Sequence, residues 1–174
     1  MQGCNFGAEG GCLPLPLVML NTGGRETPLY LISEDPMAGD RELVLATNSA
    51  FYRSFEKKDI EAMEAVWSKG MGCLCIHPGR DALKGWPDIR DAWERIFKNT
   101  SYLEIDTDIL TVEVSGDLAF VVLIENVLQI SGGDAGMDRF TSRRLEARSM
   151  ATNGFERMAG KWYMTHHHGS PVVD

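Results

Sequence analysis

The sequence predicts an α+β domain in which helices on the N-terminal side pack against one face of a curved antiparallel sheet. Between residues 40 and 99, apolar residues recur at helical spacing in three separate segments. From residue 102 onward the pattern changes to long strand-like segments separated by short turns. Helices followed by a run of strands are typical of α+β domains and not of alternating βαβ units.

The chain has 174 residues, the size of one domain with a buried core. Its 44% apolar and 24% charged residues are typical of folded globular proteins, which argues against a mainly disordered chain. Residues 1–38 are rich in Gly and Pro and lack periodicity, so we expect a poorly structured extension before one domain over residues 39–174. An alternative is that Leu15–Leu20 or Leu29–Ile32 forms a strand that adds to a sheet edge or a partner.

Two helices are predicted first. The helix from Asp40 to about Lys58 carries its apolar positions at Leu43, Val44, Thr47, Ala50, Phe51, Ser54 and Phe55. The cations of Lys57 and Lys58 suit a helix C-terminus. Asp59 then caps a second helix, whose apolar face holds Met63, Val66 and Trp67 and which ends at Gly70 and Gly72.

A short strand, Cys73–His77, and a third helix follow. Pro78 and Gly79 end the strand, and a loop leads to Gly85. The third helix opens at Trp86–Pro87, because proline is favoured in the first turn of a helix. Its buried stripe is Ile89, Trp93, Ile96 and Phe97.

The rest of the chain predicts four strands: Tyr102–Val114, Leu118–Ile130, Arg143–Arg157 and Lys161–Ser170. The second of these is a nearly continuous apolar run, which is typical of a central strand. Turns are expected at residues 115–117 and 159–160, and a Gly/Asp-rich connection at 131–140.

Charge and cysteine usage narrow the choice of partners. The formal net charge of −8 disfavours binding to nucleic acid. The four cysteines, Cys4, Cys12, Cys73 and Cys75, do not form a disulfide framework. The apolar run Leu13–Leu20 is too short to span a bilayer and lacks the flanks of a signal peptide, so we expect a cytoplasmic protein with no membrane partner.

Several motifs, in order, resemble the SnoaL-like branch of the nuclear-transport-factor-2-like superfamily. They are Asp59–Ala62, Val66–Trp67, His77–Gly79, Gly85–Trp93, Gly160–Trp162 and His166–Pro171. The resemblance covers about residues 40–171 and implies a cone of helices and a strongly curved sheet, the cystatin-like α+β fold, with many members forming homodimers through the outer sheet face. Members include ketosteroid isomerases, polyketide cyclases, dehydratases and non-catalytic binding or assembly modules, so the fold alone does not choose a function.

The resemblance to the steroid isomerases places His77 where those enzymes carry their catalytic Asp, just before a Pro. Their oxyanion-donating Tyr corresponds to Phe51, and their protonated Asp falls near Asn153. Because Phe51 cannot donate a hydrogen bond, isomerase chemistry by that set of residues is disfavoured. Tyr52 is one residue away and is expected to point elsewhere on the helix.

His77 is the first candidate catalytic residue, because a pKa near neutrality suits a general base or acid. Strand alternation puts Cys73, Cys75 and His77 on one face, and the isomerase resemblance makes this the pocket face. The alternative is a structural histidine that forms hydrogen bonds at the start of a loop.

The last strand holds the second catalytic candidate, His168. Alternation predicts that Trp162, Met164, His166 and His168 share the inward face, opposite Tyr163, Thr165 and His167. His168 or Glu125 would then polarise His77, whereas in the alternative these histidines satisfy backbone groups at a rim or a dimer interface. His77, His166 and His168 also suggest a zinc site, with Cys75 nearby, but nothing in the sequence brings the strands together, and we predict neither a metal nor an organic cofactor.

The predicted ligand-binding residues are Trp67, Cys75, Trp86, Trp93, Glu125, Asn153 and His166. The aromatic residues are mostly core, and one or two of them form an apolar pocket wall. Glu125 interrupts an apolar strand, so it is either buried and paired or faces solvent. The domain is therefore expected to bind a small apolar or amphipathic molecule, either as a cofactor-independent isomerase, cyclase, dehydratase or hydrolase with a His77 base, or as a non-catalytic ligand-binding or dimeric assembly module.

Overall fold

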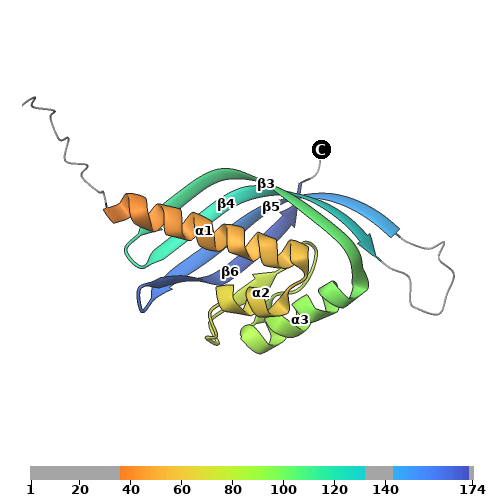
Figure 1. The fold of residues 1–174 in the computed structure, drawn as a ribbon, viewed down its shortest axis with the longest axis horizontal. Helices are drawn as coiled ribbons and strands as arrows, with labels where there is room; N and C mark the ends of the chain where they lie inside the picture. The colour runs from red at the N-terminus through yellow and green to blue at the C-terminus, as the bar shows by residue number, and fades with distance from the viewer. Residues whose placement is uncertain (1–35, 132–142, 173–174) are drawn as a thin grey trace, which may run out of the picture. The chain divides into compact units, whose positions relative to one another are not determined.

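A computed structural model describes residues 36–131 and 143–172, and this part of the chain contains three helices and one six-stranded sheet (Figure 1). The helices are α1 (Pro36–Lys57), α2 (Ile60–Val66) and α3 (Trp86–Asn99). The strands are β1 (Leu74–Ile76), β2 (Leu83–Lys84), β3 (Thr100–Ser115), β4 (Leu118–Ser131), β5 (Arg143–Met158) and β6 (Lys161–Pro171). The predicted α+β class is confirmed. The strands considered for the extension, Cys4, Cys12 and most of the predicted 131–140 connection lie outside the described residues.

The strand order is β2-β1-β6-β5-β4-β3. β1 pairs with β6 in parallel, and the other neighbours pair antiparallel. The long strands β3, β4 and β5 arch over the helices, so the sheet has a concave inner face (Figure 1). β2 is a difference from the prediction of a plain loop before Gly85, because a two-residue edge strand is too short to show alternation.

Local signals explain most of the boundaries. Asp59 caps α2 as predicted, since its Oδ1 accepts the backbone N–H groups of Glu61 at 3.1 Å and Ala62 at 3.0 Å. α1 begins at Pro36, four residues before the expected start. Lys58 has a φ of 55°, a left-handed conformation that ends α1 and lets the chain turn into α2.

The core lies between the helices and the inner face of the sheet. Its largest fully buried side chains include Trp67, Trp93, Trp162, Phe51 and Phe155. The Phe51 ring lies 5.7 Å from that of Trp93 and 6.3 Å from that of Trp67, both edge to face. Phe51, the position compared with the isomerase Tyr, is therefore a central core residue.

Helix α1 also covers the free edge of β3. Arg41 Nη1 donates to the Val112 carbonyl at 2.7 Å, and Lys58 Nζ donates to the Thr100 carbonyl at 2.9 Å. The Ile105 N–H donates to Glu56 Oε1 at 3.2 Å. These contacts satisfy groups that an exposed edge strand would offer to other chains.

A β-bulge reverses the alternation of β6. Met164 lies opposite Phe155 and His166 opposite Gly154, so Thr165 is an extra residue without a partner on β5. Beyond it, His167 is only 3% exposed, whereas His168 is exposed to solvent. The prediction that His166 and His168 face inward is therefore wrong, because it assumed unbroken alternation through Thr165.

Candidate functional site

Polar residues gather on the inner face of the sheet, where β1, β6 and β5 lie side by side. Strand pairing sets Cys75 beside His167 and His167 beside Asn153 in one row. In the next row Gly169 lies beside Ala151. The small residues of this second row leave room for longer side chains from the rows around them.

The amide of Asn153 is the centre of a buried hydrogen-bond array. Its Oδ1 lies 2.7 Å from His167 Nδ1, and its Nδ2 donates to Asn48 Oδ1 at 2.8 Å and to the Tyr52 hydroxyl at 3.1 Å. The Tyr52 hydroxyl in turn donates to Glu125 Oε1 at 2.7 Å. All five side chains are buried, so one continuous array links β6 to β4 through α1.

This array defines the protonation of His167. Because Asn153 uses its Nδ2 as a donor, its Oδ1 is the acceptor, and His167 Nδ1 carries the proton. Burial, followed by the charges of the neighbouring histidines, lowers the pKa of His167 to about 3. The ring is neutral at neutral pH, with its lone pair on Nε2, and no described residue forms a hydrogen bond to that nitrogen.

Glu125 lies at the other end of the array, buried and not facing solvent. Burial raises the pKa of its carboxyl group, and the Tyr52 hydrogen bond acts in the opposite direction. A methyl group on Gly169 would lie 3.7 Å from Glu125 Oε2 and 3.1 Å from two ring carbons of Pro78. The second carboxylate oxygen is therefore directed over Gly169, toward the residue that follows His77.

His77 lies at the end of β1, close to Cys75 and His167. Its Nε2 is 3.7 Å from Cys75 Sγ, and its ring centroid is 6.2 Å from that of His167. The Trp93 ring contacts His77 edge to face at 4.7 Å. Burial and then the Arg80 charge lower the pKa of His77 to about 4, so the half-buried ring is also neutral at neutral pH.

Cys75 is not a nucleophile in this setting. Burial, and secondarily the Glu125 charge, raises the pKa of its thiol to about 12. The thiolate, which is the reactive form, is therefore suppressed at neutral pH. Cys75 lines the site as a small apolar residue with a weak S–H donor.

Five of the predicted site residues meet in this region: His77, Cys75, Trp93, Glu125 and Asn153. Trp67 and Trp86 lie elsewhere, with ring centroids 6.3 Å apart, and Trp86 sits beneath Lys69. His166 and His168 project from the outer face, with ring centroids 6.3 Å apart. His77 and His168 thus lie on opposite faces, and the described residues form no three-ligand cluster of the kind a zinc site requires.

Three residues of the array, Asn48, Tyr52 and His167, were not predicted from the sequence. Asn48 and Tyr52 are four residues apart and share one face of α1, a spacing that could have marked them as neighbours. Tyr52 was expected to point elsewhere on the helix than Phe51, yet both side chains are buried. No alternation rule could have found His167, because its orientation depends on the bulge at Thr165.

Gly169→Ala should close the space between the histidines and Glu125. The added methyl would lie 3.1 Å from the Pro78 ring, so we expect a loss of about 1–3 kcal/mol in the free energy of unfolding. Urea denaturation measures this loss. Gly72→Ala is the matched control, since its methyl would meet no atom within 4 Å, and equal losses in both variants would contradict the tight approach.

The sequence profile described as a SnoaL-like domain matches residues 44–174. The F-box protein SKIP8 of Arabidopsis thaliana is 22% identical over 130 residues, which cover 75% of this chain and 50% of that protein. The chain thus spans about half the length of this curated relative. No helix of the described part combines the length and the hydropathy needed to cross a membrane.

Two solved structures are similar in both fold and sequence. A proposed dehydratase of the NTF2-like family from Streptomyces avermitilis is 31% identical, with a TM-score of 0.69 over 79% of this chain and 99% of that one. A proposed association domain of a calcium/calmodulin-dependent protein kinase type II from Thiobacillus denitrificans is 26% identical, with a TM-score of 0.61 over 74% of this chain and 94% of that one.

Proposed function

Because the chain belongs to the SnoaL-like family of NTF2-like domains, we propose that it binds a small apolar or amphipathic molecule against the inner face of its sheet and transfers a proton on that molecule without a cofactor. The hydrogen-bond array from His167 to Glu125 is the observation that supports this proposal. Buried polar groups cost stability unless they are paired, and a purely apolar core would avoid this cost. The array leaves Glu125 Oε2 and His167 Nε2 without a hydrogen-bond partner among the described residues, so both are free to meet a ligand.

We assign the role of base to Glu125. A histidine with a pKa near 4 is a weak base at neutral pH, whereas a carboxyl group whose pKa is raised by burial approaches the range that suits proton transfer. Tyr52 fixes one oxygen of Glu125 and leaves the other for the substrate. His77 and His167 then act as neutral hydrogen-bonding groups, in place of the base role first predicted for His77.

Dehydration or isomerisation of a carbonyl compound is the reaction type that fits these groups. Elimination of a β-hydroxyl group needs a base for the carbon acid and a proton donor for the departing oxygen. Glu125 can take the proton of the carbon acid and return it to the departing hydroxyl, which leaves as water, while neutral His77 hydrogen-bonds to that oxygen across Gly169. The similarity to a proposed dehydratase supports this choice.

Deuterium exchange tests the chemistry before the natural substrate is known. A panel of small cyclic ketones and β-hydroxy ketones would be incubated with the protein in D2O, and exchange or water loss at the carbon beside the carbonyl followed by NMR. Glu125→Gln should abolish turnover and retain ligand binding, while His77→Gln should slow it. Ligand-dependent thermal stabilisation with no exchange in the wild type would contradict catalysis and indicate a binding module.

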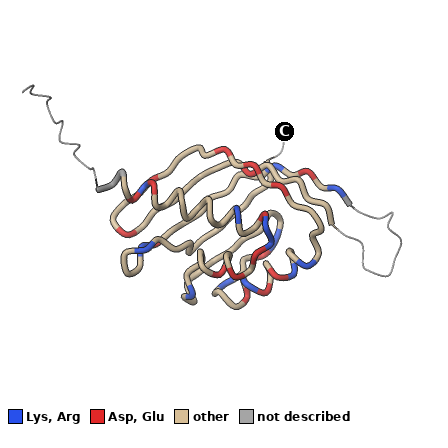
Figure 2. The backbone as a smooth tube through the Cα atoms, viewed as in Figure 1, with Lys and Arg blue, Asp and Glu red and all other residues tan. Residues whose placement is uncertain are grey.

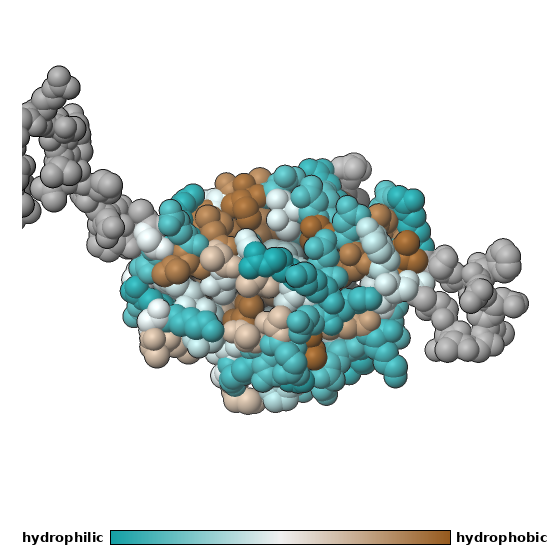
Figure 3. Space-filling view, in the orientation of Figure 1, coloured by the Kyte–Doolittle hydropathy of each residue, from teal (hydrophilic) through white to brown (hydrophobic). Residues whose placement is uncertain are grey.

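Assembly of two copies is a second candidate function, favoured by the outer face of the sheet. Leu118, Phe120 and Met150 are 61%, 43% and 42% exposed. Apolar side chains also gather at the crest of the β3 arch (Figure 3). Exposed apolar areas of this kind mark interaction sites, and the similarity to a proposed association domain points to pairing of like chains.

Sedimentation velocity tests this assembly. The wild-type chain should sediment as a dimer, and Phe120→Glu with Met150→Lys should convert it to a monomer, because buried unpaired charges are costly at an interface. Leu145→Glu, a charge placed on another exposed apolar residue of β5, is the comparison. A monomeric wild-type protein would exclude assembly as the function of this face.

A further inference from the structure

A trench runs along both sides of α2, on the outside of the molecule. One hollow of about 460 Å³ lies between α1, α2 and the start of β6. A second, of about 680 Å³, lies between α2, the loop after it and the β5–β6 turn. Ala65 and Lys161 line both hollows, so the two adjoin, and we call them together the α2 trench. The array residues line neither hollow, so the trench is separate from the interior site.

The floor of the α2 trench is apolar. Its walls include Ala46 and Ala50 from α1 and Ala62 and Ala65 from α2. The second hollow adds the larger side chains of Trp67, Met158 and Tyr163. An elongated floor with small residues at one end and aromatic residues at the other suits a chain segment with apolar anchors.

The rim of the trench carries cations that have no ion-pair partner in the described part: Arg53, Lys57 and Lys161. Arg90 contacts Glu61 and Glu94, and Arg157 contacts Asp40 and Asp117, whereas Arg80 and Arg95 form no ion pair in the described part either. Three such cations line one hollow of a chain whose net charge is −8. Figure 2 shows basic and acidic residues interspersed around the helices.

The carboxylates of the trench are already engaged. Asp59 accepts two backbone N–H groups as the cap of α2, and Glu61 pairs with Arg90. Glu64 contacts Arg90 and Lys69. The lining of the trench holds the cations of Arg53, Lys57, Lys69 and Lys161 against the carboxylates of Asp59, Glu61 and Glu64, so its formal charge is positive, which favours a negatively charged occupant.

Trp67 adds a second, independent observation. It lines the second hollow and is fully buried, yet its indole N–H has no acceptor in the described part. An unsatisfied buried donor costs about 1–3 kcal/mol, and a carboxylate or carbonyl oxygen from a bound segment would supply the missing acceptor.

We propose that the α2 trench binds an acidic, amphipathic segment of a partner protein. The apolar floor takes the hydrophobic side chains of the segment, and the cations of Arg53, Lys57 and Lys161 take its carboxylates. Nucleic acid fits less well, because the trench floor is apolar and the remaining surface is acidic overall. A flat anionic membrane cannot follow a floor recessed between two helices.

Selection from a random peptide library tests the proposal with the full chain. Peptides that bind the wild type would then be passed over the Arg53→Glu/Lys161→Glu double variant. The peptides that the double variant does not retain would be sequenced. We expect enrichment of Asp and Glu together with Leu, Phe or Trp. The Kd of an enriched peptide should rise roughly tenfold in the double variant, as expected for two rim charges. The Kd for the wild type should rise as salt is added, because salt screens the attraction between the rim cations and the carboxylates of the peptide.

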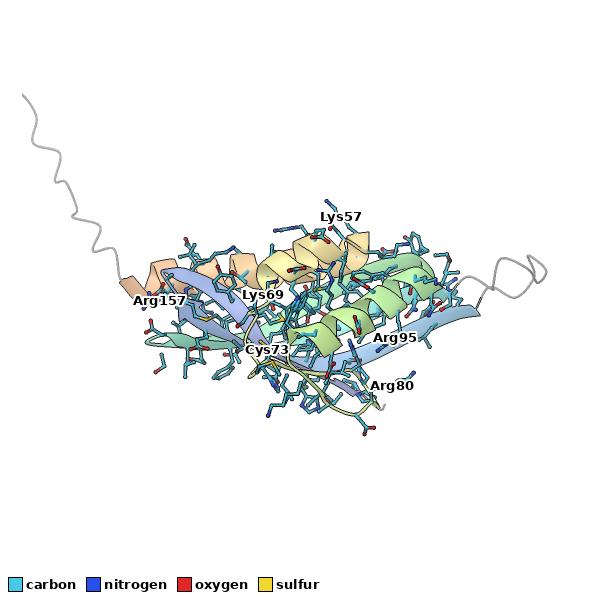
Figure 4. All side chains as sticks on the ribbon, turned by 90° about the horizontal axis from the view of Figure 1, so that it is seen from below. Lys57, Lys69, Cys73, Arg80, Arg95 and Arg157 are labelled. Carbon is cyan, nitrogen blue, oxygen red and sulfur yellow. The ribbon has the colours of Figure 1, made fainter. Side chains whose placement is uncertain are left out.

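Arg95→Glu is the matched control, because Arg95 is a cation of α3 that does not line the trench (Figure 4). It should leave the Kd of the enriched peptide unchanged. The proposal is overturned if no peptide is enriched, if the enriched peptides are neutral or basic, or if Arg95→Glu weakens binding as much as the double variant does. Tighter, Arg53-dependent binding of a polynucleotide or of phosphatidylserine vesicles would also overturn it.

Discussion

Asn153→Leu should lower the free energy of unfolding by at least about 3 kcal/mol, because it removes the centre of the buried array. The new side chain fills a similar volume but leaves three buried polar groups without a partner: His167 Nδ1–H, Asn48 Oδ1 and the Tyr52 hydroxyl as an acceptor. Each such group keeps its desolvation cost after its hydrogen bond is lost. Urea denaturation at neutral pH measures the change.

Asn126→Leu is the matched control for this loss. Asn126 lies on β4, is half-buried and makes no side-chain hydrogen bond within the described residues, so its replacement should change stability by less than about 0.5 kcal/mol. Asn153→Asp gives a milder test, since the carboxylate still accepts from His167 but no longer donates to Asn48. A loss below about 1 kcal/mol for Asn153→Leu would show that the array does not hold the fold together.

The order of helices and strands could be predicted because the start and end of each element depend on local signals in the sequence. Asp59 marks the start of α2, Pro87 that of α3, and Gly116 and Gly160 stand in turns with a left-handed φ. The alternation of side chains along a strand also predicted correctly that Cys75 and His77 lie on the same face of the sheet. Both residues lie near His167 in the structure.

The site itself depends on contacts between residues far apart in the chain. Tyr52 and Glu125 are 73 residues apart, and Asn48 and Asn153 are 105 apart, so no local pattern connects them. One extra residue, Thr165, decides which histidine of the last strand faces inward. Gly154 faces this bulge, and a methyl group there would lie only 3.1 Å from His166 Cβ. A glycine inside a strand, here Gly154 of β5, is the sequence feature that could indicate a bulge in the strand paired with it.

Stability should fall steeply on acidification from pH 6.5, because His77 and His167 are buried in the neutral form. Their pKa values in the folded state are about 4 and 3, against an ordinary value of 6.5 in the unfolded chain. Between these values the unfolded state binds more protons than the folded one. The stabilising contribution of both histidines is thus complete above pH 6.5 and is lost as pH falls toward 4 and then 3.

The surroundings of the two rings support this sign. His77 faces Cys75, Trp93 and the Arg80 charge, while His167 faces Asn153 and the other histidines. Among the described residues, no carboxylate contacts either ring. Burial also lowers the pKa of His166, as it does for His77 and His167. Glu125 acts in the opposite direction: its raised pKa gives a contribution that is present below pH 4.5 and is lost as pH rises through its folded value.

Near pH 5 each buried histidine should cost about 2 kcal/mol relative to neutral pH, and the pair about 4 kcal/mol, before the smaller opposing effect of Glu125. Urea denaturation between pH 7 and 5 measures the slope of stability against pH. His77→Gln and His167→Gln should each remove about half of that slope, whatever they do to stability at pH 7. His168→Gln, on the outer face, should keep the wild-type slope. A flat wild-type profile would mean that the two rings reach solvent, and it would remove the basis for treating them as neutral hydrogen-bonding groups beside Glu125.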